Sequence, residues 1–142
     1  MGTSNNETYH QQNIQQNTQK LRNLLREMPG FCKDYFRGIE PSTSARTRIG
    51  YAYDIRTFFR FLVSENPVLK NTEIKDINLT HLDMVEPVDI EEYMEYLKLY
   101  YYDGQKYTND ERGLHRKMAS LRSFYLYYQK RDMIKNNSTV VV

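Results

Sequence analysis

The spacing of apolar residues constrains the fold of this 142-residue chain more than any other feature of its sequence. Between residues 44 and 63 apolar side chains recur at i, i+3, i+4 and i+7, the pattern of an amphipathic helix of about 20 residues. Its apolar face holds Tyr51, Ala52, Ile55, Phe58, Phe59 and Leu62. Six glycines, four prolines and no convincing polar–apolar alternation argue against strands. The sequence therefore predicts an all-α domain.

The same spacing predicts further helices on both sides of this segment. A helix with Leu21, Leu24, Leu25 and Met28 on one face ends at Pro29-Gly30, and a short turn of helix follows over residues 31–37. The stretch Pro41-Ser42-Thr43-Ser44 supplies candidate N-caps for the 44–63 helix, and residues 80–83 are expected to form a single turn. Together with two later helices, these segments predict a compact orthogonal bundle of four to five helices.

The first of the two later helices is expected to begin at an acidic N-cap, and a turn is expected to separate it from the second. Asp89 is expected at the N-cap of one, with Glu92 in the capping-box position, and its inward face carries Ile90, Tyr93, Met94, Leu97 and Tyr101. Asp103-Gly104 is expected to end it. Asn109 can cap the last helix, which runs to about Asp132 and turns inward Leu114, Met118, Leu121, Tyr125 and Tyr128.

The composition sets the domain organisation. With 39% hydrophobic residues, the chain can close one modest core, which excludes a large multidomain enzyme. Residues 1–16 are rich in Asn, Gln, Thr and Ser and are expected to form a mobile tail before a helical domain over residues 17–135. A single cysteine, the polar N-terminus and the lack of a long apolar run predict a soluble, cytoplasmic protein.

The net charge of +2 hides an uneven distribution. Residues 1–71 carry ten basic and six acidic side chains (+4), residues 72–103 two and nine (−7), and residues 104–142 eight and three (+5). A near-neutral total therefore does not exclude an anionic partner.

The positive charge gathers on the outer faces of the two long helices. At 100° per residue, the outer face of the 44–63 helix carries Arg46, Gly50, Tyr53, Thr57 and Arg60, with Arg56 on its flank. That of the last helix carries Arg112, Arg116, Ala119, Ser123 and Lys130, bordered by His115, Arg122 and Lys117. Basic side chains around small residues suit a DNA backbone and groove, but they also suit an ordinary solvated helix face.

Three sequence blocks resemble the core-binding domain of tyrosine recombinases, the phage-integrase family. They are Thr47-Arg48-Ile-Gly-Tyr51 with its continuation to Leu62, Asp89-Ile90-Glu-Glu-Tyr93, and Arg116-Lys117-Met118-Ala-Ser-Leu121 with its continuation to Asn137. The blocks follow the family's order and spacing over residues 20–142. The resemblance implies a SAM-like N-terminal domain that holds one side of a recombination half-site in double-stranded DNA through two helices.

The resemblance also implies which residues contact DNA. The expected set is Arg46, Thr47, Arg48, Arg56 and Arg60 on the first helix, and Arg112, His115, Arg116, Lys117 and Arg122 on the second. Most are expected at phosphates, and Arg112, His115 and Arg116 at base edges.

The resemblance places the family's catalytic set in a downstream domain, beyond Val142. This chain is therefore expected not to cut DNA, whereas its parent is expected to be a recombinase that cleaves DNA with a tyrosine and assembles as a tetramer. Residues 136–142 are expected to begin the linker to the catalytic domain, although the family's closing Asn-Pro is here Asn137-Ser138.

Other chemistries have weaker support in the sequence. The tyrosines on apolar faces, and the run Tyr100 to Tyr102, indicate packing rather than a nucleophile. Cys32 is expected to be a half-buried small side chain, and the three histidines are too far apart for a metal site. No cofactor, small-molecule substrate or membrane partner is expected. A helical protein-interaction module and a stand-alone accessory factor for recombination remain as alternatives.

Overall fold

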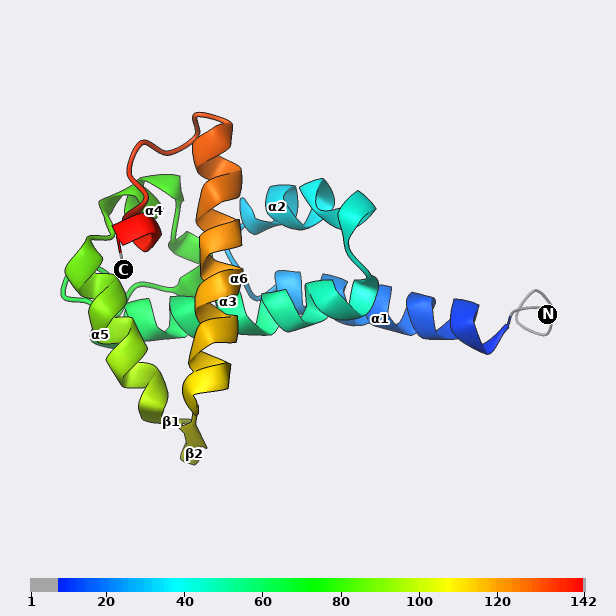
Figure 1. Cartoon of the computed structure of the whole chain (residues 1–142), viewed down its shortest axis with the longest axis horizontal. Helices are drawn as coiled ribbons and strands as arrows, with labels where there is room; N and C mark the ends of the chain where they lie inside the picture. The colour runs from blue at the N-terminus through cyan, green and yellow to red at the C-terminus, as the bar shows by residue number, and fades with distance from the viewer. Residues whose placement is uncertain (1–7, 142) are drawn as a thin grey trace.

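The computed structural model describes residues 8–141, and α-helices dominate it (Figure 1). The helices are α1 (Tyr9–Leu25), α2 (Cys32–Gly38), α3 (Ala45–Glu65), α4 (Leu79–Met84), α5 (Pro87–Lys98) and α6 (Glu111–Lys130). Three short 3-10 helices, η2 (Glu40–Ser42), η3 (Ile74–Asp76) and η4 (Ser138–Val141), complete them. Helix α1 packs along α3, and α6 crosses α3 transversely. The prediction of a compact all-α bundle is confirmed.

Helix α3 forms the centre of the core. Its predicted apolar face is buried at Ala52, Ile55, Phe58, Phe59 and Leu62, whereas Tyr51 is only partly buried. Aromatic rings from α5 and α6 pack edge-on against this face. Phe58 lies 5.1 Å from Tyr93 between ring centroids, and Phe59 lies 6.0 Å from Phe124. These contacts fix the crossing of α3 and α6 on which the candidate site depends.

Helix α1 begins within the segment for which the composition predicts a tail. Thr8 caps α1 through a capping box: its hydroxyl accepts the N–H of Gln11, and the Gln11 side chain accepts the N–H of Thr8, at 3.1 and 2.9 Å. The prediction of a mobile tail is therefore wrong for residues 9–16, which form the first turns of α1. The rest of the predicted tail, residues 1–7, lies outside the described residues.

The N-caps of the two later helices differ from the predicted residues, Asp89 and Asn109. Asp89 is the third residue of α5 and accepts the N–H of Glu86 at 2.8 Å, because Pro87 starts the helix. Asp110, not Asn109, caps α6 and accepts the N–H of Gly113 at 2.9 Å. Among the candidate caps of residues 41–44, Ser44 is the one that caps α3, and its hydroxyl accepts the N–H of Thr47 at 3.1 Å.

A β-hairpin separates α5 from α6, where the sequence predicts only a helix and a turn. Strand β1 (Leu99–Tyr102) pairs antiparallel with β2 (Gln105–Thr108). Asp103 and Gly104 connect them with φ of 54° and 78°, the left-handed conformation that two-residue hairpins require. The helix ends at Lys98, so Tyr101 is 64% exposed instead of buried.

The C-terminal segment packs against α4 and the start of α5. The Asp83 carboxylate accepts the backbone N–H groups of Lys135 and Asn136 at 2.8 and 2.6 Å. The Ser138 hydroxyl donates to the carbonyl of Val85 at 2.6 Å, and Thr139 is buried. Residues 136–141, where a linker is expected to begin, therefore lie against the helical domain.

None of the helices in residues 8–141 combines the length and apolar character that crossing a membrane requires.

Candidate nucleic-acid interface

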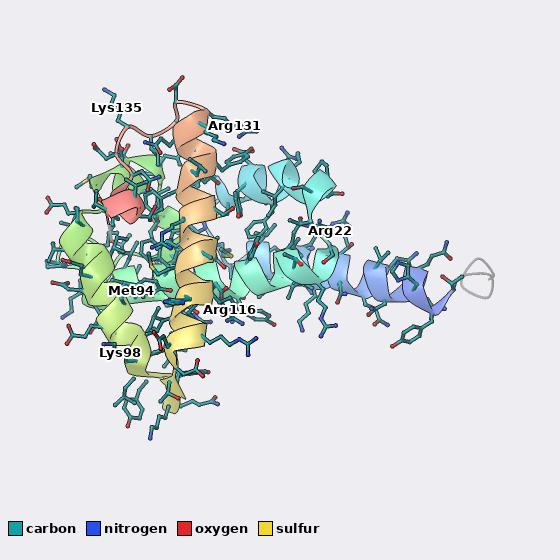
Figure 2. All side chains as sticks on the ribbon, viewed as in Figure 1. Arg22, Met94, Lys98, Arg116, Arg131 and Lys135 are labelled. Atoms are coloured by element: carbon teal, nitrogen blue, oxygen red, sulfur yellow. The ribbon has the colours of Figure 1, made fainter. Side chains whose placement is uncertain are left out.

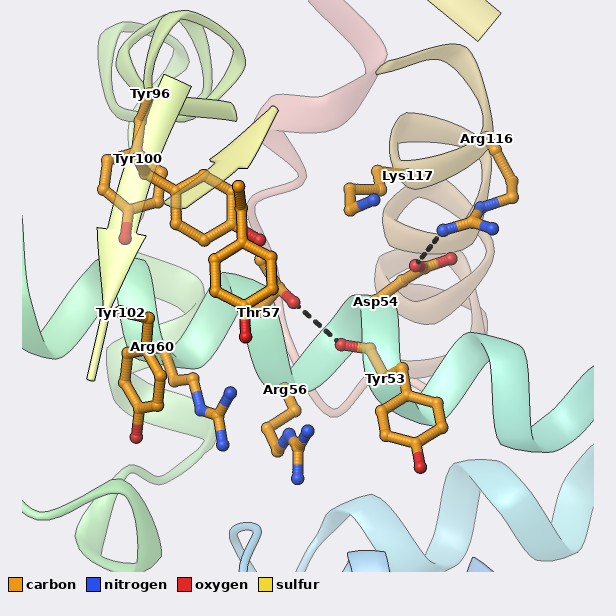
Figure 3. Close-up of a pocket in the computed structure, with 11 residues that line it drawn as sticks. Tyr53, Asp54, Arg56, Thr57, Arg60, Tyr96, Tyr100, Tyr102, Arg116 and Lys117 are labelled. Atoms are coloured by element: carbon orange, nitrogen blue, oxygen red, sulfur yellow. Dashed lines mark hydrogen bonds and ion pairs between the residues drawn. The ribbon is translucent and has the colours of Figure 1, made fainter. Parts of the chain in front are cut away.

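The two basic helices meet at a buried carboxylate. Asp54 of α3 is 4% exposed and accepts a hydrogen bond from the Arg116 guanidinium at 2.9 Å (Figure 3). It also accepts one from the Ser120 hydroxyl at 2.8 Å. The Arg116 side chain is 64% exposed, so one edge of its guanidinium is held and the rest faces solvent (Figure 2). A charge-assisted hydrogen bond that an arginine donates to a buried carboxylate orients the arginine and leaves its other donors accessible.

Asp54 is a functional candidate that the sequence interpretation missed. A carboxylate beside Ile55 on the buried side of an amphipathic helix was the available signal, because buried charges require a partner.

A cleft of about 310 Å³ opens beside this junction, between α3, α6 and the hairpin. Its basic lining residues include Arg60, Arg116 and Lys117, and Asp54 is the one carboxylate among the lining residues identified. The other side is aromatic, with Tyr100, Tyr102 and Tyr107 from the hairpin. The cleft thus joins cationic and hydroxyl donors from three elements (Figure 3).

Lys117 is the most buried cation of α6 in this cleft. Its ammonium group donates to the Asn109 side-chain oxygen at 2.7 Å. Burial lowers the pKa of Lys117, nearby Asp54 raises it in part, and the positive charge of Arg116 lowers it further. An approaching anion would favour the charged form.

Two of the predicted arginines of α3 are bound within the domain. Arg48 donates to the carbonyl oxygens of Thr43 and Glu40 at 2.5 and 3.1 Å, which ties α3 to η2. Arg56 is 19% exposed and pairs at 3.3 Å with Glu27, which lies in the turn just after α1. These contacts hold α3 in place.

The remaining predicted residues are spread over the surface. Arg46 and Arg112 are exposed and form no ion pair with another residue of the described chain. Thr47 and His115 are exposed, and Arg122 donates to the Thr139 carbonyl at 3.4 Å. Of the ten residues, the structure therefore brings Arg56, Arg60, Arg116 and Lys117 to the cleft lining, and it leaves the other six outside it.

The tyrosines expected to serve packing mostly do so. Tyr93, Tyr125 and Tyr128 are buried, and burial raises their pKa values. The hydroxyls of Tyr125 and Tyr128 donate to the carbonyls of Leu82 and Phe31 at 2.9 and 2.7 Å. Such protonated, bonded hydroxyls are poor nucleophiles.

Cys32 and the metal-ligand residues offer no reactive site in the described part of the chain. Cys32 is fully buried rather than half-buried, and burial raises the pKa of its thiol. Residues 8–141 contain no cluster of three or more His, Cys, Asp or Glu side chains arranged for a metal ion.

Comparison with known proteins finds relatives of one kind. The tyrosine recombinase XerC of Caldanaerobacter subterraneus subsp. tengcongensis is 34% identical over 113 residues, which cover 75% of this chain and 30% of that protein. The tyrosine recombinases XerC of Leptospira interrogans serovars copenhageni and Lai are each 31% identical over 99 residues, or 70% of this chain and 26% of theirs.

No family model matches the chain, and no solved structure matches it. The chain spans less than a third of the length of the curated relatives it matches. The three ordered sequence blocks, the helical bundle and these identities agree: the chain is homologous to the tyrosine recombinases and matches their N-terminal domain.

Proposed function

We propose that this domain binds duplex DNA and holds one side of a recombination half-site through α3 and α6. The observation that carries the proposal is the buried Asp54, which holds Arg116 at the edge of a cleft that also contains Arg60 and Lys117. Cations gathered where two helices cross can contact several phosphates of one duplex. Charges scattered over a solvated face are less suited to this.

The residues divide into two roles. Arg112, His115 and Arg116 lie in the first turns of α6 and are the candidates for base edges, because recognition helices contact bases through their N-terminal residues. Phosphate contacts are assigned to Arg46, Thr47, Arg60, Lys117 and Arg122. Arg48 and Arg56 support the interface indirectly by fixing α3 against η2 and against the turn that follows α1.

The whole protein would act in DNA recombination, as the name of its relatives indicates. In that protein, strand cleavage would take place in a domain other than this one, and a tetramer would bring two DNA sites together. The role of residues 8–141 is to bind and position the duplex.

A salt titration tests the proposal. Binding of the chain to a labelled duplex of about 30 base pairs, roughly three helical turns, is measured by fluorescence anisotropy at several salt concentrations. The log–log slope is expected to be clearly negative, about −0.9 for each phosphate neutralised. Binding that is undetectable at about 50 mM salt, or that does not change with salt, contradicts the proposal. A module that binds only acidic proteins would give the first of these results.

A further inference from the structure

The β1–β2 hairpin is held rigidly at its base. The rings of Tyr96, Tyr100 and Tyr107 stack in series, with centroid separations of 4.7 and 5.1 Å and interplanar angles of 20° and 13°. Asn109 adds a hydrogen bond from its side chain to the Leu97 carbonyl at 2.8 Å. An isolated two-stranded hairpin is marginally stable in water, so this aromatic stack on α5 supplies the support that the hairpin needs.

The outer half of the hairpin makes little contribution to this support. Tyr101 is 64% exposed and lies opposite Lys106 in the strand register, and Tyr102 lies opposite Gln105. These four side chains present hydroxyl, ammonium and amide donors, and Asp103 in the turn is the one carboxylate of the hairpin. An exposed tyrosine beside a lysine on a supported ribbon offers a flat apolar ring, a hydroxyl and a positive charge to a partner.

The hairpin is also joined to the basic cleft. The Arg60 guanidinium lies 3.9 Å from the centroid of the Tyr102 ring, so the hairpin and α3 share a cation–π contact. Figure 1 shows the hairpin projecting from the bundle at the end where α6 begins. A duplex that contacts the first turns of α6 would therefore pass beside it.

We propose that the β1–β2 hairpin is a third DNA-contacting element. Tyr101, Tyr102 and Lys106 contact the sugar–phosphate backbone next to the groove that α6 enters. Lysine, tyrosine and glutamine are typical donors to phosphate oxygens, and tyrosine rings can also pack on sugars. This inference rests on the proposed function, since it requires that the domain bind duplex DNA.

A single tryptophan tests the contact directly, because the chain contains no tryptophan. Tyr101→Trp places a fluorophore on the hairpin. The matched control is Tyr9→Trp, which changes another exposed tyrosine. Tyr9 is 84% exposed and lies at the start of α1, far from the hairpin (Figure 1). Addition of the duplex of about 30 base pairs is expected to quench or shift the emission of the hairpin tryptophan and to leave that of the control unchanged.

Two variants that each remove one lysine test whether the hairpin contributes to the free energy of DNA binding. Lys106→Ala is expected to reduce the magnitude of the salt slope by about 0.9, the value for one phosphate contact. Lys135→Ala removes the same charge at the opposite end of the molecule and is expected to leave the slope unchanged (Figure 2). Circular dichroism verifies that each variant keeps its helices.

The outcomes separate this inference from the proposed function. Suppose that the wild-type chain binds the duplex, that DNA does not change the emission of Tyr101→Trp, and that Lys106→Ala has the salt slope of the wild type. The proposed hairpin contact is then wrong, and the proposed interface on α3 and α6 stands. If the wild-type chain does not bind the duplex, the proposed function fails and the hairpin contact fails with it.

Discussion

The two basic helices differ in what their basic side chains already contact. On α3, Arg48 bonds to backbone carbonyls of the preceding turn, and Arg56 pairs with Glu27 in the turn after α1. On α6, Arg112 is exposed without an ion-pair partner in residues 8–141, and Arg116 is held at one edge while most of its side chain faces solvent. The two basic faces look alike in the sequence, but arginines on α3 are bonded within the domain, whereas those on α6 keep donors that face solvent.

This difference indicates a division of labour. An arginine whose donors already bond to carbonyls or a carboxylate would lose those bonds in contacting DNA, so its net gain is small. An exposed arginine, or one that a buried acceptor has oriented, loses little and brings its remaining donors to the duplex. We therefore expect substitutions on α6 to reduce DNA affinity and those on Arg48 or Arg56 to reduce stability.

The largest effect is expected on α6. The double variant Arg112→Ala and Arg116→Ala should weaken duplex binding by about 2 to 4 kcal/mol, roughly two orders of magnitude in affinity. Anisotropy titrations at one low salt concentration measure it. The control is Lys130→Ala with Arg131→Ala, the same charge change at the other end of the helix, where Figure 2 places Arg131. Equal losses in both double variants would show that only total charge matters.

The second effect concerns the junction between the helices. Asp54→Ala should lower the free energy of unfolding by about 2 to 3 kcal/mol, because it removes two hydrogen bonds to a buried charged acceptor. Urea denaturation measures the change. Asp54→Asn keeps the shape and one acceptor and should lose less. If both variants are as stable as the wild type, the Asp54 contacts do not hold the helices together.

The sequence predicted the apolar faces well because hydrophobic spacing reports directly on burial. The inward residues of α3 and α6 follow from periodicity, and the hydroxyl residues of the stretch 41–44 mark the start of α3. Asp54 could not be found this way, since a count of apolar positions has no place for a buried carboxylate. Its partner Arg116 lies 62 residues away in sequence, and only the tertiary structure brings the two together.

The hairpin was missed for a different reason. Tyrosine fits both a helix face and a strand, so the spacing of Tyr93 and Leu97 extends naturally to Tyr101. Asp103-Gly104 is the hairpin signal, since both residues adopt positive φ. At the N-terminus, Thr8 and Gln11 form the Thr-x-x-Gln capping box that composition alone overlooks.

A smaller effect on stability is expected for Arg56 of α3. Arg56→Ala should lower the free energy of unfolding by about 1 kcal/mol, since the guanidinium is mostly buried while Glu27 remains 64% exposed. A double-mutant cycle with Glu27→Ala isolates the pair and should give a coupling of about 0.5 to 1 kcal/mol. DNA affinity should change far less than in the α6 double variant. If Arg56→Ala loses more free energy of DNA binding than free energy of unfolding, Arg56 belongs to the DNA interface instead.

The smallest effect is a pH dependence at Lys117. Its pKa is lowered in the folded chain, chiefly by burial, so near its ordinary value of 10.5 the unfolded chain binds more protons at this position. The stability contributed by Lys117 therefore increases as pH rises through the folded pKa toward 10.5, because folding then buries a neutral amine. Lys117→Met lacks this group. The buried tyrosines are present in both the wild type and Lys117→Met, so their titration affects both proteins alike. The difference in the free energy of unfolding between the two, measured by urea denaturation across the alkaline range, therefore reports on Lys117. The wild type should gain stability relative to Lys117→Met as pH rises, and a constant or falling difference would show that folding does not lower this pKa.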